Sequence, residues 1–356
     1  GKRIRIRRLH MEEDPSRIVH VGGLGGKHTL LDYNRAGVPL LEIVTEPDFS
    51  SPEEARDFLH KLITILEYLG VYDSSSKAVL KSDANISLDG GKRIEVKNIT
   101  GTREIEQALK FEIFRQRNLL KRGGKIVQST RMWDPGTGTT RELRTKETEE
   151  DYGYIFEPDL TVIGLDSGKV SGIRKALPEL PEQKHARFVK AFGLNPKIAE
   201  ALVSELDLAE LFEQVAGKVD PKLAASWIAG YLKKTLNYSD LRFRDSGLKP
   251  EWIASLLKQF HAGRITDRNA ELVIRKMVKK PEPPEGIIKR DSLGRSSASS
   301  AESAVRKVLA SNRKAVQDYR SGEEKALHFL VGLVMKETRG QTDATDARKL
   351  ILKLLK

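Results

Sequence analysis

The spacing of apolar residues along the chain changes from a strand period to a helix period. Residues 2–9, KRIRIRRL, alternate Ile and Leu with Arg and Lys, which predicts a strand with one apolar and one basic face. Residues 29–44, TLLDYNRAGVPLLEIV, hold two short apolar runs broken by Asn34, Arg35 and Gly37. This pattern predicts a strand, a turn and a second strand.

After these strands, the sequence predicts two amphipathic helices followed by one hairpin. The first helix starts after Ser51, which can cap it, and ends at Gly70, with apolar residues every three or four positions between them. The second helix is predicted over 104–122 and is closed by two glycines. The runs KIVQSTRMW and TTRELRTK bracket the turn-rich DPGTG, which is typical of a β-hairpin.

Helical spacing dominates the second half of the chain, where strand-like runs disappear. KKPEPPEG is a proline-rich stop and RDSLGRSSASSAES is a Ser/Gly-rich linker. We therefore predict an α+β protein with a mixed α/β domain over 1–175 and an all-helical middle domain over 176–288. A flexible linker over 289–300 and a small helical tail domain over 301–356 complete the prediction.

Composition narrows the class of protein. The 356 residues are 39% hydrophobic and 31% charged, with no apolar run near the length of a membrane span and no signal-peptide pattern. The sequence has no cysteine, which excludes disulfides, thiolate zinc sites and cysteine nucleophiles and fits a reducing, cytoplasmic location. Because a glycine leads directly into a strand pattern, we expect the natural chain to start further upstream.

The charge of the chain is positive and unevenly distributed. A net charge of +12 favours polyanionic partners, nucleic acid first, although a solvated basic surface is the alternative explanation. Residues 295–356 hold 13 Lys and Arg against 7 Asp and Glu, so half of the excess lies in the last sixth of the chain. This concentration favours a local basic patch.

Three acidic residues, Glu12, Glu13 and Asp14, stand side by side in LHMEEDPSR. Adjacent carboxylates repel one another, and their desolvation costs free energy unless cations or hydrogen-bond donors compensate. A metal ion would supply that compensation, whereas a solvated loop is the more common reason for such a run. The run alone leaves both explanations open.

Seven strings in chain order carry a resemblance to one family. They are LHMEEDPSR, LLDYNRAGVPLLEIVTEPDFSSPEEA, LKSDANIS, RIEVKNITG, STRMWD, LRTKETEEDYGYIFEPDL and KALHFLVGLVMKETRGQTD. Together they resemble the B subunits of the tRNA-dependent glutamyl/aspartyl-tRNA amidotransferases, over essentially the whole chain. The related archaeal E subunits usually carry an inserted synthetase-like domain, and the sequence shows no such insertion between residues 165 and 300.

The resemblance implies a carbon–nitrogen ligase of protein biosynthesis that uses glutamine as amido donor. Such a B subunit uses ATP and Mg²⁺ to phosphorylate the side-chain carboxylate of Glu on tRNA(Gln), of Asp on tRNA(Asn), or of both. Ammonia from an amidase-type A subunit then displaces phosphate, and a small C subunit ties the other two together. Residues 1–175 would form the catalytic cradle, and the tail would bind tRNA.

The resemblance also implies which residues hold the metal and the phosphates. Phosphoryl transfer needs Mg²⁺ with hard oxygen ligands, and cations that offset the phosphate charge. Glu13 is the first choice for a catalytic metal ligand, and Glu42 and Asp83 come next. The residues implied to bind or orient ATP are His10, Arg35, Lys81, Asn85 and Lys97.

Each of these positions also has a structural explanation. Glu42 lies in an apolar strand, where a buried carboxylate needs a partner of some kind. Asp83 in the string SDAN can form an Asx turn. Lys97 and Glu95 alternate along a predicted strand and can simply face water.

The string KALHFLVGLVMKETRGQTD combines an apolar stripe with a polar end. Its Leu and Val residues recur at helical spacing, which predicts a packed helix face. Basic residues lie off that stripe, where they suit recognition of the tRNA body through phosphates and shape. The residues predicted to contact tRNA are Lys325, Lys336, Arg339 and Gly340.

Aromatic residues elsewhere are predicted to be structural. Tyr152, Tyr154 and Phe156 alternate as half-buried strand residues do, and Trp227 in LAASWIAG is predicted to lie in a helical core.

The sequence departs from the family pattern at its start. Members normally begin further upstream with a GLEVH-like segment, and many carry Cys in place of Ser82. We therefore expect an incomplete kinase site in this chain. A second class of function stays open, namely a non-catalytic adaptor that binds tRNA, which would tolerate the loss of Glu13 where a Mg²⁺-dependent kinase would not.

Overall fold

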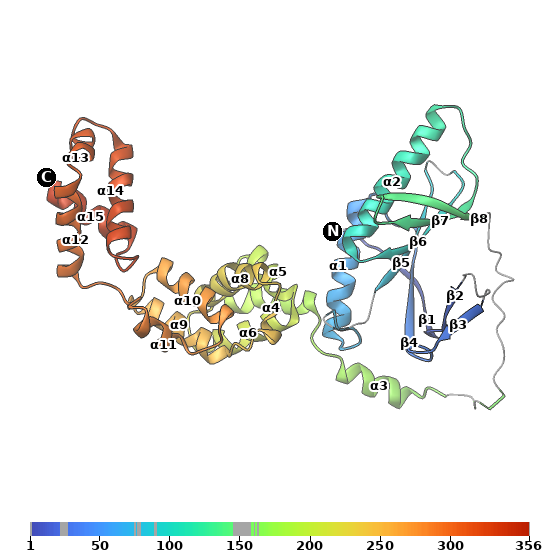
Figure 1. Cartoon of the computed structure of the whole chain (residues 1–356). Helices are drawn as coiled ribbons and strands as arrows, with labels where there is room; N and C mark the ends of the chain where they lie inside the picture. Colours follow the sequence, from blue (N-terminus) through green and yellow to red (C-terminus); the bar gives the residue numbers. More distant parts are fainter. Residues whose placement is uncertain are drawn as a thin grey trace. The chain divides into compact units, whose positions relative to one another are not determined.

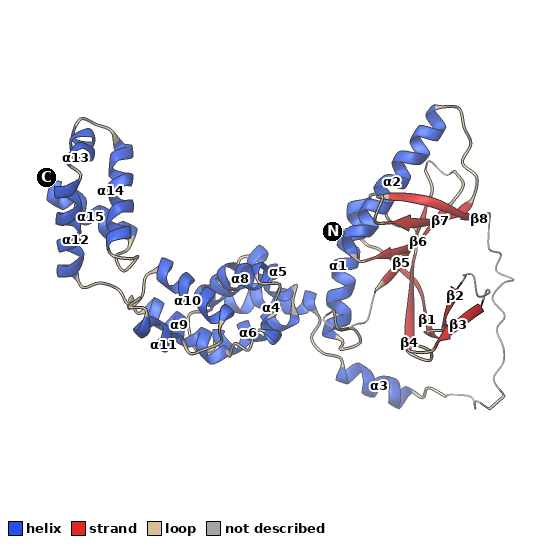
Figure 2. Ribbon diagram, viewed as in Figure 1, coloured by secondary structure: helices blue, strands red, loops and turns tan. Residues whose placement is uncertain are grey.

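The structure is a computed structural model that describes residues 2–21, 28–74, 76, 80–88, 91–144, 158–159, 161 and 164–355. It has two compact units, Gly1–Leu66 with Tyr72–Ser171, and Glu67–Val71 with Gly172–Lys356. Strands and helices mix in the first unit and helices make up the second (Figures 1 and 2). The coarse fold prediction, a mixed region followed by a mostly helical one, is confirmed. The strand prediction for Tyr152 to Phe156 lies outside the described residues.

The first unit begins with two separate two-stranded antiparallel sheets. β1 (Ile6–Glu13) pairs with β4 (Pro39–Thr45), and β2 (Arg17–Val21) pairs with β3 (His28–Asp32). The predicted strand, turn and strand of residues 29–44 are confirmed as β3 and β4. These two neighbours in sequence do not pair with each other, and each pairs instead with an earlier strand.

A four-stranded sheet with the order β5-β6-β7-β8 forms the centre of this unit. The strands are β5 (Lys81–Ile86), β6 (Ile94–Thr100), β7 (Ser129–Asp134) and β8 (Thr139–Arg144). β6 and β7 run parallel and the other pairs run antiparallel, so the predicted hairpin around DPGTG is confirmed as β7 and β8.

Two helices pack on one face of this sheet, α1 (Pro52–Tyr68) and α2 (Thr102–Lys121). The predicted cap of α1 is present, since the hydroxyl of Ser51 accepts a hydrogen bond from the N–H of Glu54 at 3.2 Å. The core between helices and sheet contains strand residues such as Ile94 and Val96 and helix residues such as Ala108. The opposite face of the sheet therefore carries the polar residues of the same strands.

The second unit is built from helices. They are α4 (Pro181–Phe192), α5 (Pro196–Val203), α6 (Leu206–Ala216), α7 (Pro221–Trp227), the π-helix η2 (Ile228–Leu232), α8 (Lys233–Tyr238), the 3₁₀-helix η3 (Phe243–Asp245), α9 (Pro250–His261), α10 (Asp267–Lys279), α11 (Pro284–Arg290), α12 (Ala298–Ser311), α13 (Arg313–Arg320), α14 (Glu324–Glu337) and α15 (Ala344–Leu355), with α3 (Ser167–Ala176) at the start of the helical half. In the described parts of the chain, no helix is long and apolar enough to cross a membrane.

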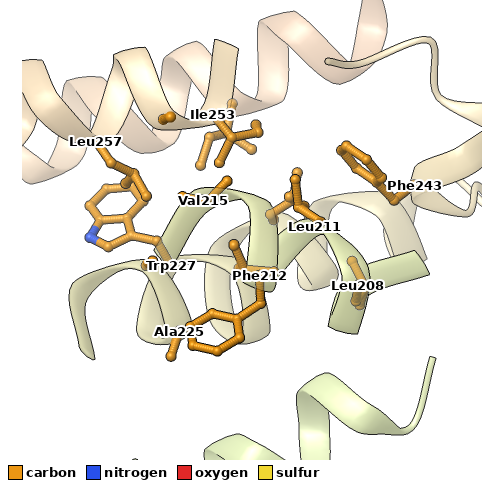
Figure 3. Close-up of a cluster of buried hydrophobic side chains, with 14 of the residues drawn as sticks. Leu208, Leu211, Phe212, Val215, Ala225, Trp227, Phe243, Ile253 and Leu257 are labelled. Carbon is orange, nitrogen blue, oxygen red and sulfur yellow. The ribbon is translucent and has the colours of Figure 1, made fainter. Parts of the chain in front are cut away.

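The helices of the second unit enclose two apolar cores. The larger one lies among α4 to α11, where Phe212, Trp227 and Leu257 are buried together (Figure 3). The prediction that Trp227 is a core residue is confirmed, since it is 4% exposed. A smaller core lies among α12 to α15 and includes Val305 and Leu330.

Polar contacts join the start of α10 and the segment before α12 to the segment after α14. The buried hydroxyl of Thr266 donates to the carbonyl of Gly340 at 2.6 Å, and the N–H of Ser296 donates to the carbonyl of Gln341 at 3.0 Å. The flexibility predicted for 289–300 stays a prediction, and in this structure the end of that segment is hydrogen-bonded to the tail.

We expect Gly340→Ala to destabilise the protein by about 1–3 kcal/mol. A methyl group at Gly340 would lie 2.6 Å from Oδ1 of Asn269, and the φ of +78° disfavours any side chain. Gly332→Ala is the matched control, because Gly332 lies within α14 with open space around it. Alanine there should be neutral or stabilising by about 0.5–1 kcal/mol, and equal unfolding temperatures for both variants would contradict the prediction.

Candidate active site

The pairing of β1 with β4 brings a histidine and two carboxylates together. His10 lies opposite Glu42 in the register, and Glu12 lies two residues from His10 and so shares its face of the strand. One possible ligand atom of each residue lies within 4.8 Å of the others. All three side chains are accessible from solvent, so a ligand could reach them.

The chemistry of this group suits a divalent cation. Nδ1 of His10 lies 3.4 Å from Oε2 of Glu42, and a guanidinium nitrogen of Arg8 lies 3.8 Å from the same oxygen. Two carboxylates are the hard oxygen ligands that Mg²⁺ prefers, and a histidine beside one of them can fix its orientation. The residues therefore fit Mg²⁺ through Glu12 and Glu42, with His10 as the orienting group.

Glu13 is placed differently from Glu12. Because successive side chains of a strand point to opposite faces, Glu13 lies on the face of Leu9 and Met11, both exposed. Its role as a metal ligand stays a prediction. Glu12 was not among the predicted metal ligands, and the alternation of side chains that starts at His10 favours it over Glu13.

The third acid of the run has a partner within the loop that precedes β4. A carboxylate oxygen of Asp14 lies 2.8 Å from Nε of Arg35, and the backbone N–H of Asp14 donates to the carbonyl of Val38 at 2.8 Å. Asp14 thus connects the turn between β3 and β4 to the end of β1. Arg35 stays a predicted phosphate ligand, and to bind phosphate it would have to share its charge with Asp14.

A second charged group lies on the face of the four-stranded sheet away from α1 and α2. Nζ of Lys97 lies 3.8 Å from Oδ2 of Asp83 and 3.7 Å from Oε1 of Glu95. The hydroxyl of Thr130 donates to Oε2 of Glu95 at 3.2 Å. Glu95 was not among the predicted site residues, although it lies on the same face as Lys97.

Two further candidates lie on β5 and are exposed. Asn85 is opposite Glu95 in the register and therefore shares its face, whereas Lys81 begins the strand opposite Thr100. Asn85 therefore lies on the face of the charged group, whereas Lys81 lies at the start of β5. Their roles in binding ATP stay predictions.

An irregularity in the ladder between β5 and β6 sets this arrangement. Val96 and Ile99 are both fully buried although they are three residues apart, so strict alternation is broken between them. Asn98 takes up the extra residue with a φ of +65°, a conformation that Asn adopts more readily than most residues. Its backbone N–H donates a hydrogen bond to the carboxylate of Asp83.

The electrostatics of Asp83 connect the two charged groups. Partial burial of the carboxyl raises the pKa of Asp83, and the nearby negative charges of Glu95 and Glu42 add to this rise. The positive charge of Lys97 and the N–H of Asn98 oppose it. Glu42 belongs to the β1–β4 sheet, so the pKa of Asp83 also depends on a carboxylate of the other charged group.

The predicted tRNA contacts of the tail fall into two environments. Lys325, Lys336 and Arg339 are exposed on or just after α14, whereas Gly340 is buried against Asn269. Lys325 also borders a groove of about 480 Å³, whose other lining residues include Arg313, Lys314 and Phe329. The structure thus gives Gly340 a packing role, and its contact with tRNA stays a prediction.

The geometry predicts which glutamate of the run binds a metal. Glu12→Gln and Glu42→Gln should each weaken Mn²⁺ or Mg²⁺ binding by roughly tenfold or more, because each removes one charged oxygen ligand. Glu13→Gln is the matched control and should leave the affinity unchanged, since Glu13 lies on the other face of β1. Titration calorimetry measures all three, and loss of affinity only in Glu13→Gln would contradict this assignment.

The raised pKa of Asp83 predicts a gain in stability on neutralisation. Since its charge disfavours the folded state, Asp83→Asn should raise the thermal unfolding temperature at pH 7. The gain should shrink as pH falls through the raised pKa, because the wild-type carboxyl then takes up a proton.

Asp134 is the matched control on the same sheet. A hydrogen bond from Arg141 lowers the pKa of Asp134, so its charge favours the folded state. Asp134→Asn should therefore lower the unfolding temperature at pH 7, and this loss should shrink as pH falls through the lowered pKa. Shifts of the same sign in Asp83→Asn and Asp134→Asn at pH 7 would contradict the prediction.

Comparison with known proteins gives the family. Residues 1–171 match the GatB/GatE catalytic domain, and residues 210–355 match the GatB domain. The chain is 45% identical over 372 residues to the B subunit of the aspartyl/glutamyl-tRNA(Asn/Gln) amidotransferase of Methanosarcina barkeri, a match that covers 99% of this chain and 75% of that protein.

The same name is carried by similar proteins of other organisms. Those of Methanothermobacter thermautotrophicus and Carboxydothermus hydrogenoformans are 42% and 41% identical, over 98% of this chain and 76% and 75% of their own lengths. The resemblance found in the sequence is thereby confirmed, and the chain belongs to the family of aspartyl/glutamyl-tRNA(Asn/Gln) amidotransferase B subunits.

Proposed function

We propose that this chain uses ATP and Mg²⁺ to phosphorylate the side-chain carboxylate of Glu or Asp carried on tRNA. Its family consists of subunits of amidotransferases that convert misacylated Glu-tRNA(Gln) or Asp-tRNA(Asn) to the amidated form. The phosphorylation is the step of that conversion that needs a site for metal and phosphates. The first unit carries the residues suited to it.

The observation that carries the proposal is that one compact unit holds two groups of carboxylates with basic residues beside them. His10, Glu12 and Glu42 form one group, and Asp83 with Lys97 belongs to the other. Mg²⁺ held by Glu12 and Glu42 would offset the charge of phosphate oxygens.

The reaction proceeds in two transfers. An oxygen of the substrate carboxylate attacks the γ-phosphorus of ATP, ADP leaves, and an acyl phosphate forms. Ammonia then attacks the carbonyl carbon, the C–O bond breaks and phosphate leaves. Lys97 would neutralise negative charge on the phosphates, and Arg35, Lys81 and Asn85 keep their predicted parts in phosphate binding.

The proposal includes partners and a division of labour. An amidase-type A subunit supplies ammonia and a small C subunit holds it to this chain, in the cytoplasm where tRNA is charged and used. The separate apolar cores of the second unit support a helical middle domain and a distinct tail domain. The exposed Lys325, Lys336 and Arg339 support the tail as a tRNA-binding domain.

Phosphate release from γ-labelled ATP tests the proposal. The full-length subunit is assembled with its amidase-type and small partners, and misacylated Glu-tRNA(Gln) and Asp-tRNA(Asn) are compared with uncharged tRNA. We expect release only with a misacylated tRNA, and a loss of roughly 100-fold or more in Glu42→Gln, because the Mg²⁺ that would offset the phosphate charge loses an oxygen ligand.

The control separates catalysis from tRNA binding. Glu42→Gln should keep the affinity of the complex for tRNA, since the change lies at the metal and phosphates. Phosphate release that is unaffected by Glu42→Gln and by Glu12→Gln would sink the kinase assignment. A non-catalytic adaptor that positions tRNA would then explain the family membership better.

A further inference from the structure

The outer face of α2 carries an exposed aromatic residue among basic ones. The buried residues of α2 include Ile105, Ala108 and Glu112, and they pack toward the sheet. Phe114, Arg117 and Lys121 recur at spacings of three and four on the opposite side of the helix. All three are exposed, and Phe114 keeps 64% of its surface in solvent.

The charge of this region is entirely positive. Residues 113–133 contain six Arg and Lys and no Asp or Glu. Two of the six, Arg115 and Arg131, lie beside the buried carboxylate of Glu112. The other four are Arg117, Lys121, Arg122 and Lys125, and among the residues that the structure describes none of these four forms an ion pair.

Folding alone explains only part of this pattern. Basic residues in the last turn of a helix stabilise its negative end, which accounts for Lys121 and Arg122. That effect falls off beyond the last turn, so it does not account for Arg117. Nor does it account for Phe114, whose ring is not packed into the core between α2 and the sheet.

We infer that this α2 surface, made of Phe114, Arg117 and Lys121 with Arg122 and Lys125 in the turn that follows, binds the tRNA substrate. The inference rests on the proposed function, because that function makes tRNA the polyanion that reaches the catalytic unit. Arg117 and Lys121 lie about 6 Å apart along the helix axis and contact successive phosphates. Phe114, one turn before Arg117, stacks on an unpaired base.

A protein partner is the other occupant that such a surface could take. Leu120 and Val127 are also exposed nearby, at 44% and 66%, and would suit an apolar contact. Four unneutralised cations weigh against it, because burying them against a protein requires acidic partners at each position. An RNA backbone carries a negative phosphate at every nucleotide, so charge complementarity favours RNA.

Salt dependence of tRNA binding tests the inference in the complete amidotransferase complex. Affinity for an uncharged tRNA transcript is measured between roughly 50 and 200 mM salt. The slope of log affinity against log salt is negative. In the double variant Arg117→Gln, Lys121→Gln, its magnitude should decrease by about 1.5 to 2, because each lost cation removes one phosphate contact. Phe114→Ser should weaken binding roughly 5- to 100-fold with an unchanged slope, and Phe114→Trp should restore it.

Lys110→Gln is the matched control. Lys110 lies on the same face of α2, but its ammonium is already paired with Glu53 at 2.7 Å and Glu106 at 2.5 Å. Its loss should leave the slope unchanged, provided that each variant keeps the unfolding temperature of the wild type.

Two results would overturn the inference. One is an unchanged slope in the double variant. The other is loss of the amidase-type partner from the complex on size exclusion with normal tRNA affinity of what remains assembled, which would make the surface a protein interface. Because binding is measured without ATP, failure of the phosphorylation proposal would leave these slopes intact and appear only as absent phosphate release in the wild type.

Discussion

Repulsion between carboxylates is the constraint on which the catalytic unit depends. Partial burial of its carboxyl raises the pKa of Asp83 most, and the negative charges of Glu95 on the same sheet and Glu42 on the β1–β4 sheet raise it further. Such a group is tolerated only where solvent and cations reach it, and here Arg8 and Lys97 stand beside the acids. The sheet meets this constraint by sending its apolar side chains to α1 and α2 and leaving its charged face uncovered by them.

The break in the alternation of β6 at Asn98 decides which side chains lie on each face of the sheet. If β6 were regular, Ile99 would point to the face of Lys97, and a large apolar side chain would stand among the charges. The extra residue returns Ile99 to the core and turns the N–H of Asn98 toward Asp83. A left-handed backbone costs free energy for a residue other than glycine, and burial of Ile99 offsets it.

Local rules predicted most elements of this fold, and register decided the rest. The cap at Ser51, the helix after it and the hairpin around DPGTG depend on neighbours in sequence, and each was found correctly. The choice between Glu12 and Glu13 depends on which residue shares a face with Glu42, and two adjacent acids look equivalent until the strand pairing is known. The three-residue spacing of the apolar Val96 and Ile99, with an Asn between them, would have predicted this irregularity from the sequence.

Gly340 shows that contacts between residues far apart in the sequence are equally hard to predict. Its contacts also bear on the flexibility of the segment before the tail. Its sequence neighbours are basic, which suggested tRNA, whereas its closest contact is Asn269, far away in sequence. The contacts around it are hydrogen bonds from Thr266 and Ser296 to backbone carbonyls. Each such bond contributes only about 0.5–1.5 kcal/mol, because water can replace it, whereas opening either apolar core would expose many buried side chains. The flexibility predicted for residues 289–300 therefore requires only this polar joint to open, and both apolar cores stay closed.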